Sequence, residues 1–211
     1  MAGGRKKQSR SSFPSGPAST RVKVGNAEAG GSQHGPRKTK KKFRKFSWSQ
    51  ISLKSEIGEG AFAKTHRAQV TMADRSIVIA AVKVFKTQQY DTTECRLLTA
   101  AAGAGGAPKI FGISKGLPSA IIMELCPGQP LYDFFECNPV DECKKAYEAV
   151  KIALLDFHTK GFTHQDLHPG NILIDRVDNK YVAHLIDLGK SRMLGQDPSM
   201  DKSYVEQDNE G

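Results

Sequence analysis

The stretch THQDLHPGN at residues 163–171, followed by LIDLG at residues 185–189, determines how the rest of this chain is interpreted. It places an acid, Asp166, five residues before an amide, Asn171, and a second acid, Asp187, follows one more apolar segment. Phosphoryl transfer uses an acid that orients the attacking hydroxyl, together with an amide and a carboxylate that hold magnesium. The complete pattern therefore predicts a phosphoryl-transfer site, although any one of these acids alone is typical of an ordinary loop.

A glycine-rich segment and a lysine lie upstream of that pattern. The segment IGEGAFA at residues 57–63 has glycines at which backbone amides can approach a phosphate without a side chain in the way. Lys83 follows Gly60 by 23 residues and lies within the apolar run at residues 77–85. A lysine in a buried strand is costly unless it has an anionic partner. The alternative is an edge strand whose lysine reaches solvent.

Glu94 is the candidate partner of Lys83. Residues 91–102 are predicted to form a helix that ends at Gly103. A second interpretation comes from the spacing of Asp91 and Glu94, which also fits an N-terminal cap in which Glu94 faces backbone amides. An ion pair with Lys83 and a capping role are both compatible with the sequence.

These motifs, in this order, resemble those of the protein kinase superfamily, whose catalytic loop reads H-R-D-x-x-x-x-N and whose metal motif reads D-F-G. The resemblance covers about residues 48–193. It implies an α+β fold of two lobes with a shortened C-terminal lobe. The implied parts are an N-terminal lobe at 48–123, a hinge at 124–128 and a partial C-terminal lobe at 129–211. ATP and Mg²⁺ are the implied cofactors, and a protein hydroxyl is the implied acceptor of the γ-phosphate.

The resemblance also implies roles for individual residues. Asp166 would orient the acceptor hydroxyl, Lys83 would anchor the α- and β-phosphates, and His168 would lie beside the transferred phosphate. Asn171 and Asp187 would hold magnesium. These are the expected catalytic and metal-binding residues.

Contacts to the nucleotide are expected from the glycine-rich loop, the lysine strand, the following helix and the hinge. The expected residues are Ile57, Gly58, Gly60, Ala81, Lys83, Glu94, Glu124 and Cys126. At the hinge, the backbone of Glu124 and Cys126 would bond adenine. The resemblance makes Met123 the gatekeeper, although ordinary core filling explains a methionine at this position equally well.

Two positions of the catalytic loop depart from the protein kinase pattern. Gln165 replaces the arginine that clamps an activation-loop phosphate, so control by phosphorylation of that loop is not expected. His168 stands where serine/threonine kinases usually carry a lysine, and the loop also resembles that of aminoglycoside and choline kinases. A small-molecule kinase is therefore an alternative function.

The segment after the metal motif is short. Asp187 is followed by 24 residues without an Ala-Pro-Glu motif, and residues 195–211 are polar and expected to be loosely ordered. The chain is expected to be either a minimal atypical kinase or a piece of a longer protein. A nucleotide-binding pseudokinase or scaffold is a further alternative.

Charge is concentrated at the N-terminus. Residues 1–47 carry 13 of the 31 lysines and arginines and one acid, Glu28, which gives this segment a net charge of +12. Because it is rich in Gly, Ser, Pro and Lys, it is expected to be a disordered basic tail. The cluster at residues 37–45 could contact a polyanion or a nuclear import receptor, or could serve only solubility.

The remaining features predict an intracellular protein in the nucleus or cytoplasm. The four cysteines lack C-x-x-C spacing, and no signal peptide or transmembrane segment is evident. Hydrophobic periodicity predicts a first strand near residues 51–57, a hairpin, a long helix and a second hairpin. The first hairpin is expected at residues 65–72 and 76–86, and the long helix at residues 141–159. The second hairpin is expected at residues 172–174 and 181–186.

Overall fold

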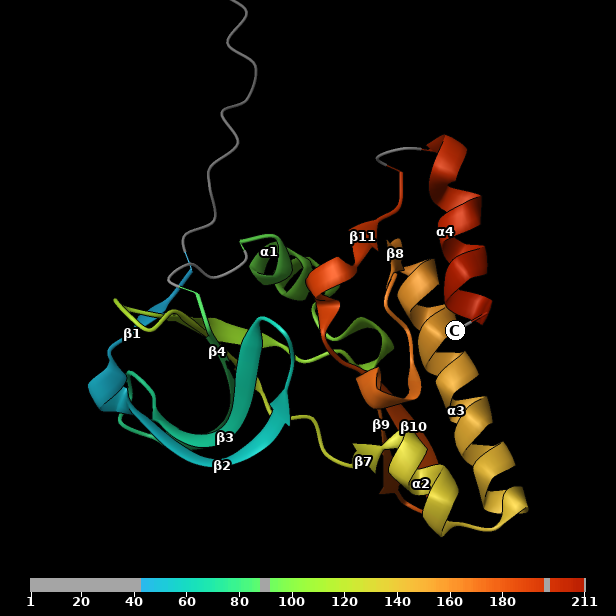
Figure 1. Cartoon of the computed structure of the whole chain (residues 1–211), viewed down its shortest axis with the longest axis horizontal. Coiled ribbons are helices and arrows are strands. Elements are labelled where there is room, and N and C mark those ends of the chain that lie inside the picture. The colour runs from blue at the N-terminus through green and yellow to red at the C-terminus, as the bar shows by residue number, and fades with distance from the viewer. Residues whose placement is uncertain (1–42, 88–91, 196–197, 211) are drawn as a thin grey trace, which may run out of the picture. The chain divides into compact units, whose positions relative to one another are not determined.

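The computed structural model of the protein describes residues 43–87, 92–195 and 198–210. The described residues belong to one compact unit, whose strands and helices are drawn in Figure 1. The helices are α1 (Thr92–Ala101), α2 (Leu131–Cys137), α3 (Val140–Thr159) and α4 (Pro198–Glu210). Helices and sheets together confirm the predicted α+β class. The predicted tail lies, through residue 42, outside the described residues, so its disorder stays a prediction.

A six-stranded sheet dominates the N-terminal part. Its strands are β1 (Lys45–Phe46), β2 (Ile51–Glu59), β3 (Ala63–Thr71), β4 (Ile77–Phe85), β5 (Ile110–Ser114) and β6 (Ala120–Glu124). Their order is β1-β5-β6-β4-β3-β2, and all neighbours are antiparallel except β1 and β5. The strand predicted near residues 51–57 is β2, and β3 and β4 form the hairpin predicted at residues 65–72 and 76–86.

Strand β4 separates two apolar clusters. Ala80 and Val82 belong to one cluster, whereas Ala81 and Phe85 belong to the other, because successive side chains of a strand point to opposite faces. Lys83 shares the face of Ala81 and Phe85. This face is also contacted by α1, so the strand register brings the lysine toward that helix.

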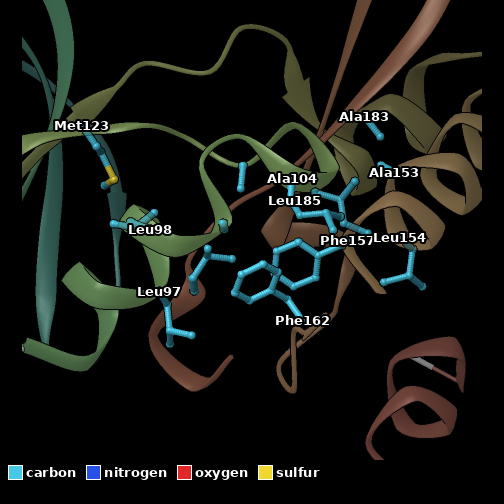
Figure 2. Close-up of a cluster of buried hydrophobic side chains, with 14 of the residues drawn as sticks. Leu97, Leu98, Ala104, Met123, Ala153, Leu154, Phe157, Phe162, Ala183 and Leu185 are labelled. Carbon is cyan, nitrogen blue, oxygen red and sulfur yellow. The ribbon is translucent and has the colours of Figure 1, made fainter. Parts of the chain in front are cut away.

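The C-terminal part is built around α3. Its apolar face buries Ala146, Ala149, Val150, Ala153, Leu154 and Phe157. Strands β7 (Gln129–Pro130), β9 (Ile172–Val177) and β10 (Lys180–Leu185) form a small antiparallel sheet beside it, and β8 (Phe162–Thr163) pairs with β11 (Arg192–Met193). Figure 2 shows Phe157, Phe162 and Leu185 in the same buried cluster as Leu97 and Leu98 of α1. The predicted long helix and second hairpin are thus confirmed.

Short 3-10 turns link several of these elements. They are η1 (Trp48–Gln50), η2 (Ala104–Gly106), η3 (Pro169–Asn171) and η4 (Leu188–Lys190). Turn η3 leads into β9 and η4 follows β10. The hairpin therefore places Asn171 and Asp187 at the same end of its two paired strands.

The structure corrects two expectations about the ends of the folded part. Lys45 and Phe46, assigned to the tail from sequence, form β1 instead, and Phe46 is fully buried. Residues 198–210, expected to be loosely ordered, form helix α4, which Figure 1 shows beside the C-terminal half of α3. Composition did not predict this helix because the segment is polar, although it contains one acid, Asp208, that is buried in the fold.

Two further features concern exposure. In β2, Leu53 and Ile57 are exposed, so this face of the strand is not buried. Cys126 is half-buried, and all four cysteines are free thiols. None of the described helices combines the length and apolar character needed to cross a membrane.

Candidate active site

Lys83 joins three segments of the chain. Its Nζ lies 2.9 Å from Oε1 of Glu94 on α1 and 2.7 Å from Oδ1 of Asp187, which is 104 residues away. The side chain of Glu94 is 3% exposed and that of Lys83 is 13% exposed, so this contact is buried, whereas Asp187 is 47% exposed. The structure therefore has the ion pair between Lys83 and Glu94 that was one of the two interpretations of the sequence.

The charges of this cluster stabilise one another. Burial disfavours the charged form of Lys83, but the carboxylates of Glu94 and Asp187 outweigh it, and the pKa of Lys83 lies above its ordinary value. Burial likewise acts to raise the pKa of Asp187, but the Lys83 ammonium outweighs it and the pKa is lowered. Both groups are thus charged at neutral pH, as binding of an anionic nucleotide and a cation requires.

The glycine-rich turn between β2 and β3 is held at its base and open at its tip. The Gly60 amide donates to the Ala63 carbonyl over 2.9 Å, and Glu59 pairs with Lys86 at 2.7 Å and with Lys64 at 3.1 Å. A Cβ added to Gly58 would meet no atom within 4 Å, so packing alone does not require glycine there. This is compatible with a glycine kept for the approach of a ligand.

Strands β3 and β4 separate Ile57 and Gly58 on β2 from β6, the strand that leads into the hinge. Ala81 on β4 is paired in register with Met123 on β6, and both are buried. Met123 belongs to the apolar cluster of α1 and α3, so core packing accounts for it as well as a gatekeeper role does. Half of the Ile57 surface is exposed.

Glu124 and Cys126 use their side chains within the protein. The Glu124 carboxylate accepts from the Lys109 amide at 3.3 Å, and the Cys126 thiol lies 3.7 Å from the Gly106 carbonyl. Burial, followed by the charge of Glu124, raises the pKa of Cys126 to about 12, so the thiol is protonated. Contact of these residues with a base would therefore come from the backbone, as expected from sequence.

Asp166 and Asn171 are fixed to one another by the catalytic loop. The Asn171 amide Nδ2 donates to the Asp166 carbonyl over 2.9 Å, and Oδ1 of Asp166 lies 2.7 Å from Nζ of Lys190. The His168 Nδ1 accepts from the Gly170 amide at 3.1 Å and caps turn η3. Sequence analysis did not identify Lys190, for which no motif gives a signal.

The metal motif has a strained backbone that an apolar side chain anchors. Asp187 has a φ of 60° and ψ of 71°, in the left-handed region, and its Oδ1 accepts from the Gly189 amide at 3.3 Å. Leu188 is fully buried in the core. Such strain at a non-glycine residue persists only where the surroundings hold it, and it concentrates at functional sites.

The oxygen donors of Asn171 and Asp187 fit a magnesium ion. Because Nδ2 of Asn171 is engaged with Asp166, its side-chain carbonyl oxygen is the atom left for a cation. Carboxylate and amide oxygens are ligands that Mg²⁺ accepts, with water and phosphate completing the shell. Within the described ranges, no group of three or more His, Cys, Asp or Glu side chains forms a metal site.

Asp208 on α4 holds the catalytic loop and was not identified from sequence. Its carboxylate accepts from the backbone amides of His164 at 2.6 Å and Gln165 at 2.7 Å, and it lies 3.0 Å from Nε2 of His158. Gln165 also donates from its side chain to the Tyr204 carbonyl at 3.0 Å. An acid in a polar segment gives no local signal of such a role.

Comparison with known proteins agrees with this arrangement. The family model of the protein kinase domain matches residues 51–208. A putative ribosomal protein S6 kinase alpha-2 of Caenorhabditis elegans is 28% identical over 148 residues, which is 65% of this chain and 18% of that protein. The serine/threonine-protein kinase pkn2 of Myxococcus xanthus is 26% identical over 158 residues, 74% of this chain and 17% of that protein. The chain thus spans less than a fifth of the length of these two relatives.

Proposed function

Because the chain belongs to the protein kinase domain family, we propose that it transfers the γ-phosphate of ATP to a hydroxyl group of a protein in a magnesium-dependent reaction. One observation carries the proposal most directly. Lys83 contacts Glu94 and Asp187 at the same time, which joins the sheet, helix α1 and the metal motif in one charged cluster. Asp166 and Asn171 lie in the adjoining catalytic loop.

Binding of the nucleotide falls to the N-terminal part of the site. Lys83, kept charged by its two carboxylate partners, would bond the α- and β-phosphates beneath the turn at Gly58 and Gly60. Asn171 and Asp187 would hold magnesium, which when bound would supply positive charge against the phosphates. Asp187 would exchange part of its contact with Lys83 for this cation.

Transfer would take place beside Asp166. The oxygen of the acceptor hydroxyl attacks the γ-phosphorus, the bond from that phosphorus to the β–γ bridging oxygen breaks, and ADP leaves with that electron pair. The proton of the hydroxyl passes to the Asp166 carboxylate. Positioning and charge stabilisation account for catalysis of this kind, without a covalent intermediate on the protein.

A small-molecule alcohol is the second candidate acceptor. Ten residues, 188–197, connect Asp187 to α4, and α4 itself holds the catalytic loop through Asp208. Because this connection is short, it provides few residues beside Asp166 that could bind an extended polypeptide substrate. The histidine at position 168 also matches the loop of aminoglycoside and choline kinases noted above.

The test is transfer from γ-labelled ATP with Mg²⁺ to the chain itself, to a casein and histone mixture, and to a panel of aminoglycosides and choline. Label on protein, abolished in Asp187→Ala, supports the proposed protein kinase. Label only on a small alcohol supports the second candidate. If Mg-ATP binds but no acceptor is labelled, the protein is a pseudokinase and the proposal of turnover is wrong.

A further inference from the structure

Asp166, the proposed catalytic base, has a cationic partner from outside its own loop. Nζ of Lys190 lies 2.7 Å from Oδ1 of Asp166, and 24 residues separate the two in sequence. The Lys190 side chain is 66% exposed and that of Asp166 is 33% exposed. The pair therefore lies at the solvent-facing side of the site, where an acceptor and the terminal phosphate have to meet.

Turn η4 fixes the position of Lys190. The turn begins after Asp187, Leu188 anchors it in the core, and the Ser191 amide closes it by donating to the Leu188 carbonyl at 3.1 Å. The buried Leu188 side chain thus holds in place the turn that carries Lys190, three residues after the proposed metal ligand Asp187. Its flexible four-carbon stem lets the ammonium move between neighbouring anions without backbone movement.

The histidine in the catalytic loop is poorly suited to supply this positive charge. The Nδ1 atom of His168 accepts a hydrogen bond from the Gly170 amide at 3.1 Å. This bond caps turn η3 and engages the histidine ring within its own loop. Lys83 is occupied with Glu94 and Asp187. Lys190 is therefore the cation that the structure places on Asp166.

We propose that Lys190 is a catalytic residue of the phosphoryl transfer, which bonds the terminal phosphate of ATP while it stays beside Asp166. This inference rests on the proposed function and adds to it the source of positive charge at the transferred group. The negative charge on that phosphate and on Asp166 would otherwise repel, and an ammonium between them favours their approach. An ion pair made only in the absence of nucleotide is the competing explanation.

Binding of two nucleotides tests the proposal without knowledge of the acceptor. The full chain, Lys190→Ala and Lys190→Arg are titrated with Mg²⁺ and either ADP or the non-hydrolysable ATP analogue with a β–γ imido bridge. Lys160→Ala is the matched control, because Lys160 makes a similarly exposed pair with Asp156 at 2.9 Å. Intrinsic ATP hydrolysis, with water as acceptor, is measured in parallel.

Loss of Lys190 should lower the preference for the triphosphate analogue over ADP by about tenfold, since one charge-assisted bond to the terminal phosphate disappears. Affinity for ADP and the melting temperature should stay at wild-type values. Hydrolysis should fall by about 10²-fold, and arginine should restore part of both losses. Lys160→Ala should change none of these quantities.

The outcomes separate this inference from the proposed function. If the wild type binds both nucleotides and Lys190→Ala keeps the same preference, the inference is wrong and the proposed function stands. If His168→Ala removes the preference and Lys190→Ala does not, the charge comes from the histidine and the inference is again wrong. If the wild type binds neither nucleotide, the proposed function fails and the role of Lys190 fails with it.

Discussion

Asp208 accepts a hydrogen bond of 2.6 Å from the backbone amide of His164, although 44 residues separate them. The same carboxylate bonds the Gln165 amide at 2.7 Å, and its side chain is 1% exposed. Gln165 has a φ of 62°, so the backbone just before Asp166 is in the left-handed region. A buried carboxylate on α4 thus holds a strained loop in the conformation that presents Asp166.

Replacement of Asp208 should therefore destabilise the fold. In Asp208→Asn one side-chain oxygen becomes an NH₂ donor that faces a backbone amide, so one of the two amide bonds is lost. We expect a loss of about 2–4 kcal/mol in the free energy of unfolding, measured by urea denaturation, because a buried donor is left unsatisfied. Asp201→Asn, on the same helix, is the control, and an equal loss in both variants would contradict the role of Asp208.

The contribution of Asp208 should also depend on pH. Burial acts to raise its pKa, but hydrogen bonds from His158, Gln165 and His164 outweigh it, and the pKa lies below the ordinary value of 3.8. Because the folded-state pKa is depressed, the stabilisation is fully present above the unfolded value and is lost as the pH falls through the folded value. The difference in unfolding free energy between wild type and Asp208→Asn should hence be constant above about pH 5 and shrink below pH 4. A difference that grows toward low pH would contradict this sign.

Substitutions of Asp166 and Asp187 should have different effects on phosphate transfer and on ATP binding. Asp166→Asn removes the group that receives the hydroxyl proton, so transfer should fall by about 10²–10⁴-fold while ATP affinity changes little. Asp187→Asn removes a ligand charge, so magnesium-dependent ATP binding should weaken along with transfer. Calorimetric titration of Mg-ATP and a labelled-phosphate assay on both variants provide the comparison. Wild-type transfer by Asp166→Asn would exclude Asp166 as the catalytic base.

Local motifs explain why much of this site was predictable. The glycine-rich segment, the lysine strand and the THQDLHPGN loop each specify their own geometry through residues close in sequence. Alternation along β4 places Lys83 on the face that α1 covers, and the β9–β10 hairpin brings Asn171 and Asp187 to one end. The sequence alone therefore carries the resemblance to protein kinases.

Contacts between distant residues explain what was missed. Lys190 and Asp208 are single charged residues in polar surroundings, and only the folded chain shows that each meets the catalytic loop. The strand at Lys45–Phe46 was not predicted because its basic neighbours dominate the composition around Phe46, which the sheet buries. Composition describes a segment on average and cannot identify one buried side chain within it.

The pair between Lys83 and Glu94 should matter for both binding and stability. Glu94→Gln keeps the shape of the side chain but removes one of the two carboxylate charges that outweigh the burial of Lys83. We expect ATP affinity to fall by about tenfold and the unfolding free energy to fall by about 1–3 kcal/mol, because a buried ammonium loses a carboxylate partner. Glu148→Gln is the matched control, since its pair with Lys151 at 2.6 Å is exposed and worth little. Equal effects of the two variants, measured by titration and by denaturation, would contradict the prediction.

Two N-terminal deletions should distinguish the contribution of the basic segment from that of strand β1. Deletion of residues 1–42 removes 11 of the 31 basic residues and leaves β1 in place. If this segment contacts polyanions, the deletion should abolish most salt-dependent binding to heparin or RNA, with the melting temperature and ATP affinity unchanged. Unchanged RNA affinity at low salt would show that the basic surface lies elsewhere.

Deletion of residues 1–47 should, in contrast, destabilise the fold. It removes the Arg44 and Phe46 carbonyls, which accept from the Ile113 amide at 2.9 Å and the Lys115 amide at 2.7 Å. It also removes the Phe46 ring from the core formed with β3, β4 and β6, and truncation of a buried phenylalanine typically costs about 3–5 kcal/mol. We expect a clearly lower melting temperature for this deletion than for the deletion of residues 1–42. Identical melting curves for the two would mean that β1 contributes nothing to stability and that the folded part begins after it.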